Sequence, residues 1–206
     1  MPEITSYKTI NRKSEGYFKD RGSKFYSFAF PVETEEETEK HREKLRKEYH
    51  DARHHVYAFR LGIDGKTFRA SDDGEPSNSS GPPVLGQIKS DELTNILIVV
   101  VRYFGGTKLG IPGLINAYKT AAKEAIKNTK IVTKAIKAKF KFSYDYAFTN
   151  SMMSFVHAED IQILDQNFEA SCEMFVAVPL NQAKKITAKL DNTKGIAYES
   201  LGEVIL

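Results

Sequence analysis

The segment 95–127 constrains the fold most, because it has the pattern of a buried strand, a glycine-rich turn and a helix. Ile96–Val101 is an unbroken run of leucine and β-branched residues, which is typical of a strand covered on both faces. The polar and aromatic residues that follow are expected to leave the sheet: Arg102, Tyr103 and Phe104. Four glycines then loosen the backbone around Lys108: Gly105, Gly106, Gly110 and Gly113.

A helix is expected from about Pro112, which suits a first helical turn because its missing N–H would be unpaired there. One face repeats apolar side chains at helical spacing and should pack on the sheet: Leu114, Ala117, Tyr118, Ala121, Ala122 and Ala125. Another face carries Lys119, Lys123 and Lys127 toward solvent. The free N–H groups at the start of such a helix favour an anion such as phosphate.

Charge is distributed unevenly along the chain, although the net charge is only +3. Residues 102–141 contain ten Lys or Arg and one acid, Glu124, which leaves about nine positive charges on this stretch. A local excess of this size is typical of surfaces that bind phosphate groups. The alternative is a solvated surface that happens to be basic.

Composition argues against a disulfide-stabilised, an exported and a membrane-spanning protein. The single cysteine, Cys172, excludes an internal disulfide framework and fits a reducing cytoplasm. It alternates in phase with apolar residues, so we interpret it as a core side chain: Phe168, Ala170, Met174, Val176 and Val178. The sequence has neither an apolar run of about 18 residues nor an export signal, so a cytoplasmic protein without membrane contact is expected.

The first 134 residues are expected to form one domain. Its further elements are two short strands within residues 1–33, a charged helix at 34–50, strands at 54–63 and 66–70, and a helix at 84–93. Thr34 followed by Glu37 is a capping-box pattern that fits the start of the charged helix. A long polar loop joins the strand at 66–70 to the helix at 84–93, and loops of this length are usually functional or mobile.

A second domain is expected from residue 135 to the end, after a short strand or connection at 128–134. Its pattern is strand 135–146, helix 148–158, strands 161–168 and 171–178, helix 182–190 and strand 196–205. In the first strand Ala138, Phe140 and Phe142 alternate with lysines. The order β-α-β-β-α-β is that of ferredoxin-like domains, so the fold class is α+β.

The polar loop contains three acids within four residues, Asp72, Asp73 and Glu75. Oxygen ligands at this density could hold Mg²⁺. The alternative, which we favour, is a turn whose Asp side chains bind nearby backbone N–H groups.

His54 and His55 are neighbours on a strand and should face opposite sides. If His54 lay beside Asp73 and Arg102, it could act as a general base, although a structural histidine is commoner.

The usual nucleotide, dinucleotide and zinc-site motifs are absent, so no cofactor and no metal are expected. Tyr57, Tyr103 and Phe104 lie near basic residues, as stacking on unpaired bases would require, but core packing explains Tyr57 equally well.

The motifs SDDGEP, GPP, VRYFGGTKLG and GLINAY together resemble the IMPACT/YigZ family, and the resemblance covers most of the chain. It matches His54, Asp72, Asp73, Glu75 and the stretch from Arg102 to Gly110. The chain departs from the family pattern at Asn78-Ser79-Ser80, Pro112 and Asn116. The resemblance implies a first domain like domain IV of elongation factor G and a second like its domain V.

That pair of domains suggests an RNA- or ribosome-binding protein with a role in translation and without catalysis. The expected phosphate-binding and stacking residues are Arg102, Tyr103, Phe104, Gly105, Gly106, Lys108, Lys119, Lys123 and Lys127. One alternative is a hydrolase or transferase for a phosphorylated small molecule or nucleotide, with His54, Asp72, Asp73 and Glu75 as candidate catalytic residues. Another is a protein–protein adaptor that docks through the helix at 34–50.

Overall fold

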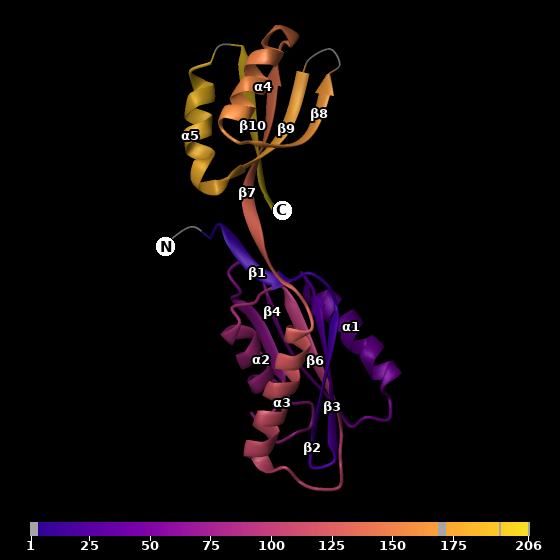
Figure 1. Cartoon of the computed structure of the whole chain (residues 1–206). Coiled ribbons are helices and arrows are strands. Elements are labelled where there is room, and N and C mark those ends of the chain that lie inside the picture. The colour runs from indigo at the N-terminus through magenta and orange to yellow at the C-terminus, as the bar shows by residue number, and fades with distance from the viewer. Residues whose placement is uncertain (1–3, 169–171, 194, 206) are drawn as a thin grey trace. The chain divides into compact units, whose positions relative to one another are not determined.

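The computed structural model describes residues 4–168, 172–193 and 195–205, and its chain divides into two compact units (Figure 1). The first unit is Tyr7–Thr133, and the second runs from Lys134 onward together with the described residues before Tyr7. Each unit combines helices with an antiparallel sheet, so the fold is α+β.

The first unit contains a sheet of five strands in the order β2-β3-β6-β4-β5. These strands are β2 (Ser14–Asp20), β3 (Ser23–Pro31), β4 (His54–Leu61), β5 (Thr67–Ser71) and β6 (Ile96–Tyr103). The prediction of two strands before residue 33 was wrong, because β1 (Ser6–Ile10) precedes β2 and β3. Each of these three strands is separated from the next by only two or three residues, which hides the boundaries in the sequence.

Strand β6 lies at the centre of this sheet, and Ile96–Arg102 are all buried. Its even-numbered residues Ile96, Ile98 and Val100 join one hydrophobic core, while its odd-numbered residues join the core on the opposite face. Arg102 and Tyr103 were expected outside the sheet, and that prediction was wrong. Both residues continue β6 and pair with Phe25 and Lys24 of β3.

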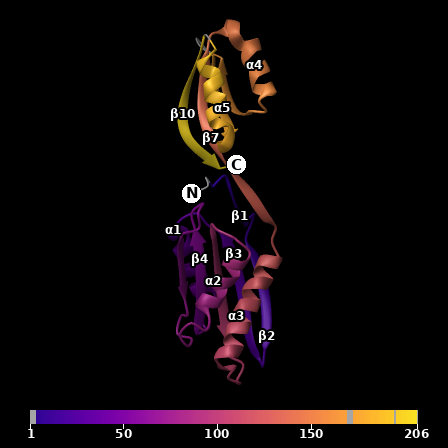
Figure 2. The ribbon, with the colours of Figure 1, turned by 90° about the vertical axis from the view of Figure 1, so that its left-hand side faces the viewer.

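Helices cover both faces of this sheet (Figures 1 and 2). On one face lie α2 (Gly81–Ser90) and α3 (Gly110–Lys127), and on the other lies α1 (Glu35–Glu48). The apolar face predicted for α3 is confirmed, since Leu114, Ala117, Tyr118, Ala121, Ala122 and Ala125 are buried. The cap predicted for α1 is confirmed as well, because the Glu37 N–H donates to Thr34 Oγ1 over 3.2 Å. Helix α2 starts three residues before the predicted Val84, at Gly81.

The second unit follows the predicted order of elements. These are β7 (Ile131–Tyr144), α4 (Thr149–Ala158), β8 (Gln162–Phe168), β9 (Cys172–Pro179), α5 (Leu180–Asp191) and β10 (Ile196–Ile205), with a 3-10 turn at Tyr146–Phe148. The sheet order is β1-β7-β9-β8, and β10 also pairs with β7. Residues 128–134 were expected to form a separate element, but β7 runs without a break from Ile131.

The core of the second unit lies between its sheet and both helices. Phe140 and Phe142 of β7 pack with Met152 of α4 and Ile186 of α5. Cys172 is a buried free thiol in this core, as predicted, while Phe168 is about half exposed and Ala170 lies outside the described residues. In the part of the chain that the structure describes, we find no helix with the length and apolarity needed to cross a membrane.

Candidate functional site

Three residues from different strands form one row across the end of the first sheet. Phe25 of β3 and His54 of β4 are the direct partners of Arg102 on β6. Phe25 belongs to the core beneath α2 and α3, so the Arg102 side chain also points to that face. Tyr118 of α3 packs edge-on against Phe25, with 5.2 Å between the ring centroids. This arrangement places a buried guanidinium between the sheet and α3.

Glu75 reaches this row from the acidic loop and neutralises Arg102. The Arg102 Nη1 donates to Glu75 Oε1 over 2.6 Å, and the Tyr118 hydroxyl donates to the same oxygen over 2.7 Å. The Glu75 and Arg102 side chains are only 4% and 7% exposed. Burial, and then the negative charge of Glu75, raises the pKa of Tyr118, so this hydroxyl keeps its proton and remains a donor.

His54 lies at the outer side of this buried pair. Its Nε2 is 4.0 Å from Glu75 Oε1, its Nδ1 is 2.9 Å from the Asp73 carbonyl oxygen, and its side chain is 22% exposed. We call His54, Glu75, Arg102 and Tyr118 the buried polar cluster. The cluster unites His54, the acidic loop and Arg102, which the enzyme hypothesis requires. Tyr118 was predicted only as a core residue, because its spacing on α3 carries no sign of a polar partner.

The acidic loop is a turn held by its own carboxylates, as the favoured interpretation predicts. Asp72 accepts hydrogen bonds from the N–H groups of Asn78, Ser80 and Gly81 over 2.7, 3.0 and 2.8 Å, and from Ser80 Oγ over 2.7 Å. Burial raises the pKa of Asp72, but the bonds from Ser80, Gly81 and Asn78 outweigh it and hold that pKa below its usual value. Asp72 thereby binds the first N–H groups of α2.

Asp73 has other hydrogen-bond partners than Asp72 and Glu75. Its carboxylate accepts from Arg46 Nη2 over 2.7 Å and from the His55 N–H over 2.6 Å. The three acids therefore engage different protein donors, and within the described residues no group of His, Cys, Asp or Glu could hold a metal ion. His55 is buried on the opposite face from His54, and burial lowers its pKa.

A second candidate site is a hollow of about 420 Å³ beside the ends of β3, β6 and α1. Its lining combines four aromatic rings with one lysine and one glycine: Gly22, Lys24, Tyr26, Tyr49, Tyr103 and Phe104. We call it the aromatic hollow. The Tyr26 ring lies 6.2 Å from Tyr49 and 6.0 Å from Tyr103, measured between centroids. Phe104 is 57% exposed, so its ring is available to a ligand.

The Tyr103 ring is held by its hydroxyl, which donates to Asp51 Oδ1 over 2.6 Å. That hydrogen bond, together with burial and the Asp51 charge, raises the pKa of Tyr103 to about 12. Tyr103 thus stays neutral at physiological pH and presents an uncharged ring. Tyr57, by contrast, is buried beneath α1 with the Arg42 guanidinium 3.6 Å from its ring centroid, so it cannot stack on a base.

The glycine-rich turn crosses the start of β3 at very short range. The Gly105 N–H donates to Ser23 Oγ over 3.2 Å, and a Cβ on Gly105 would overlap the backbone of Gly22 and Ser23. Gly106 has φ +88, a conformation that favours glycine. These contacts fix Phe104 at the edge of the hollow, while Lys108 remains exposed.

The structure separates the residues predicted to bind phosphate. Tyr103 and Phe104 line the hollow and the glycine turn follows them in the chain, but Arg102 is buried and paired with Glu75. The solvent face predicted for α3 is confirmed, with Lys119, Lys123 and Lys127 exposed. That helix covers the face of the sheet opposite to the hollow. Lys24, Tyr26 and Tyr49 were missed, because only strand register and the packing of α1 bring them to Tyr103.

Comparison with known proteins identifies the family to which this first unit is similar. Residues 21–126 match the family model described as the Impact N-terminal domain, which is about half of the chain. The chain belongs to the IMPACT family. The matched residues include the whole buried polar cluster and the whole aromatic hollow.

IMPACT family members from bacteria resemble most of the chain. The protein YigZ of Escherichia coli is 31% identical over 150 residues, which cover 72% of this chain and 74% of that protein. An IMPACT family member of Haemophilus influenzae is 29% identical over 170 residues and 82% of both chains. A crystal structure of a hypothetical protein is similar over 96% of this chain and 97% of that chain, with a TM-score of 0.67 and 27% identity.

Proposed function

We propose that this IMPACT-family chain binds single-stranded RNA through the aromatic hollow and acts in translation. The observation that carries the proposal is the hollow itself, where exposed Phe104 stands beside Tyr103, Tyr26 and Lys24. Aromatic faces stack on unpaired bases with little regard to sequence, and a neighbouring ammonium group attracts the phosphate backbone. The hollow has both kinds of group in one place.

Lysines beside the hollow and on the opposite face of the sheet supply the positive charge that an RNA backbone would follow. Lys24 lies in the hollow, and Lys108 is exposed on the glycine turn next to it. Beyond the turn, the outer face of α3 carries Lys119, Lys123 and Lys127. In the proposed complex the backbone leaves the hollow over Lys108 toward this face.

A role at the ribosome is supported by the likeness expected between the two units and domains IV and V of elongation factor G. The second unit has the element order β-α-β-β-α-β of ferredoxin-like domains. Fold likeness alone does not define a function. The RNA-binding proposal therefore rests on the aromatic hollow, and the likeness to elongation factor G supports only the proposal that this binding takes place at the ribosome.

The test is binding of a labelled ten-nucleotide uridine RNA, followed by fluorescence anisotropy at about 50 and about 300 mM salt. Phe104→Ala is expected to weaken binding by roughly five-fold to 150-fold, the range for loss of one base–aromatic stack. Phe68→Ala is the matched control, since Phe68 is also exposed and has Lys89 over its ring but lies outside the hollow. Lys24→Gln is expected to reduce the salt dependence by about one phosphate contact, a slope change of roughly 0.7.

Salt-independent binding, or equal losses in Phe104→Ala and Phe68→Ala, would rule out the hollow as the RNA site. The triple substitution of Lys119, Lys123 and Lys127 by Glu tests the path over α3 separately. It is expected to weaken binding while leaving the effect of Phe104→Ala intact. Cosedimentation of the same variants with ribosomes then tests whether the chain binds the ribosome through the same residues.

A second candidate function is hydrolysis or group transfer on a phosphorylated substrate. One observation favours it: His54 lies 4.0 Å from Glu75 at the accessible side of the buried polar cluster. A histidine beside a carboxylate has the arrangement of a general base. A screen of phosphorylated metabolites tests this candidate, with turnover expected to be lost in His54→Gln and kept in the exposed control His50→Gln. Failure of every substrate to turn over would remove it.

A further inference from the structure

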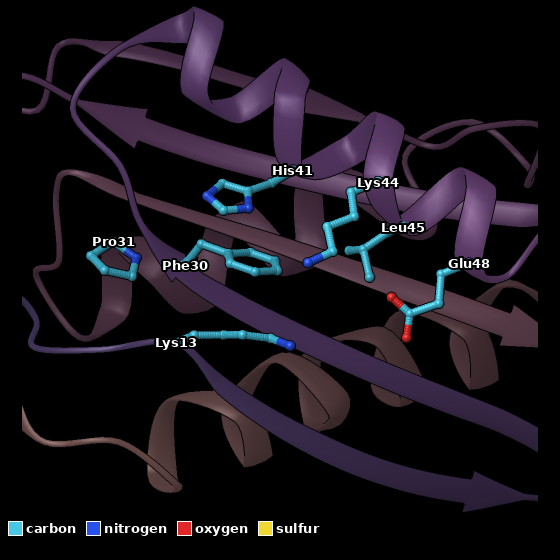
Figure 3. A pocket seen from close by; sticks show the side chains of 7 residues that line it. All are labelled: Lys13, Phe30, Pro31, His41, Lys44, Leu45 and Glu48. Atoms are coloured by element: carbon cyan, nitrogen blue, oxygen red, sulfur yellow. The ribbon is translucent and has the colours of Figure 1, made fainter.

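A separate pocket of about 330 Å³ lies between α1 and β3 (Figure 3). Helix α1 lines one side, β3 forms the floor, and a lysine from the turn between β1 and β2 lines the other side: His41, Lys44, Leu45, Glu48, Phe30, Pro31 and Lys13. We call it the α1–β3 pocket. It has no lining residue in common with the aromatic hollow.

The floor of the pocket is apolar and ordered by ring stacking. Phe30 and Leu45 are 6% and 3% exposed, so they are packed in the core and show only a small apolar area at the base of the pocket. The His41 ring stacks on Phe30, with 4.1 Å between centroids and 18° between planes. An apolar group of a ligand would lose water where it meets this small area and the His41 ring.

The rim of the pocket is positively charged. Figure 3 shows the side chains of Lys13 and Lys44 extending from opposite sides toward the space beside the Phe30 ring. The Lys13 ammonium lies 5.6 Å from the Phe30 ring centroid and is paired with Glu15 at 2.7 Å. Among the described residues no carboxylate lies within 4.0 Å of the Lys44 ammonium, so that charge is available to a ligand.

The histidine of the pocket is kept uncharged mainly by its burial. Burial lowers the pKa of His41, and Lys44 and Lys13 lower it further, while Glu37 opposes them. His41 is therefore neutral at physiological pH, and its ring adds to the apolar floor. Glu48 carries the one carboxylate that lines the pocket.

We propose that the α1–β3 pocket binds a small organic anion with an aromatic or branched apolar body. The anionic group would lie between Lys13 and Lys44, and the body would lie on Phe30 and Leu45. The space is sufficient, because a cavity of roughly 150 Å³ already holds a benzene ring. A neutral ligand would leave the Lys44 ammonium unpaired, and a bare inorganic anion would make no contact with the apolar floor.

The test uses benzoate and phenylphosphate as probes of the two anionic groups, with benzyl alcohol and inorganic phosphate as partial ligands. Binding to the full-length chain is followed through the ring signals of His41 in NMR spectra, which His41→Gln assigns. Benzoate or phenylphosphate is expected to bind at least ten-fold more tightly than benzyl alcohol, because an ionic hydrogen bond adds to the apolar contact. The better of the two identifies the ligand as a carboxylate or a phosphate ester.

Lys44→Gln is expected to weaken that binding by up to about five-fold, the upper end of the range for an exposed ion pair. Lys47→Gln on the same helix is the matched control, since Lys47 is exposed and does not line the pocket. The proposal is overturned if benzyl alcohol binds as well as the anions, if inorganic phosphate binds as well as phenylphosphate, or if Lys47→Gln has the same effect as Lys44→Gln. Absence of any shift of the His41 signals up to the solubility of the probes overturns it as well.

Discussion

Replacement of Glu75 by alanine is expected to lower the free energy of unfolding of the first unit by about 3–5 kcal/mol, the cost of removing one partner from a buried ion pair. The pair is buried on both sides, with 4% of the Glu75 side chain and 7% of the Arg102 side chain exposed. Without Glu75 the guanidinium remains charged in a region that is largely closed to water, and the Tyr118 hydroxyl loses its acceptor.

Other contacts of Arg102 cannot replace this carboxylate. Its Nη2 donates to Ser23 Oγ over 3.4 Å, and its Nε is buried without a hydrogen-bond partner among the described residues. The Phe25 and Phe104 rings lie 5.6 and 5.7 Å from its guanidinium carbon. Because Phe104 also lines the aromatic hollow, loss of Glu75 is expected to loosen that hollow in addition to destabilising the unit.

The measurement should resolve the two units, since a chain with two compact units need not unfold in a single step. Hydrogen exchange of the β6 amides reports on the first unit, and that of the β9 amides reports on the second. Glu43→Ala on the exposed side of α1 is the matched control. It should leave the hydrogen exchange of both the β6 amides and the β9 amides unchanged. The double variant Glu75→Leu with Arg102→Met is expected to recover most of the loss. Equal stability of Glu75→Ala and Glu43→Ala would contradict the role of the pair.

The elements that the sequence predicts well are those whose pattern is local. The run Ile96–Val101 and the apolar spacing of α3 determine a covered strand and its helix without information from elsewhere in the chain. The elements of the second unit are predicted for the same reason, since burial alternates along β7 and at the start of β9 and the connections are short. Local pattern fails at Arg102, where a charged residue ends the apolar run but continues the strand. The partner that permits its burial, Glu75, lies 27 residues away in a loop.

The candidate sites depend on strand register, which one sequence does not reveal. Antiparallel pairing places His54 beside Arg102 on β6, and only this register gives the buried polar cluster its histidine. Tyr26 lies opposite Val101 of β6, and α1 then brings Tyr49 onto the same face. The early start of α2 also has a distant cause, because Asp72 binds the Gly81 N–H from nine residues away.

Removal of that carboxylate is expected to have the second large effect. Asp72→Ala should lower the free energy of unfolding of the first unit by about 2–4 kcal/mol, since several hydrogen bonds to a charged group are lost at once. Ser80 and Gly81 are buried, so their N–H groups would lose their acceptor in a place where water could not substitute for it. Helix α2 also begins with Pro82 and Pro83, which have no N–H groups, so Asp72 binds the donors that remain at this end.

The effect of Asp72 should depend on pH in a defined direction. The pKa of Asp72 is lowered in the folded chain, so its stabilisation is fully present above the unfolded value of about 3.9. It is lost as pH falls through the folded pKa. The difference in stability between wild type and Asp72→Ala is therefore expected to be constant from about pH 5 to 7 and to shrink below about pH 4.

Urea unfolding followed through the β6 amides at a series of pH values measures this difference. Asp64→Ala is the matched control, because Asp64 also accepts a backbone hydrogen bond in a turn, from the Lys66 N–H over 3.1 Å, but lies at the surface. Asp64→Ala should lower the free energy of unfolding of the first unit much less than Asp72→Ala does at every pH. Asp72→Asn should fall between wild type and Asp72→Ala, since its amide keeps one acceptor oxygen but turns its NH₂ group toward the N–H donors of Ser80 and Gly81. A loss in Asp72→Ala that stayed the same down to pH 2 would show that the carboxylate charge does not hold the start of α2.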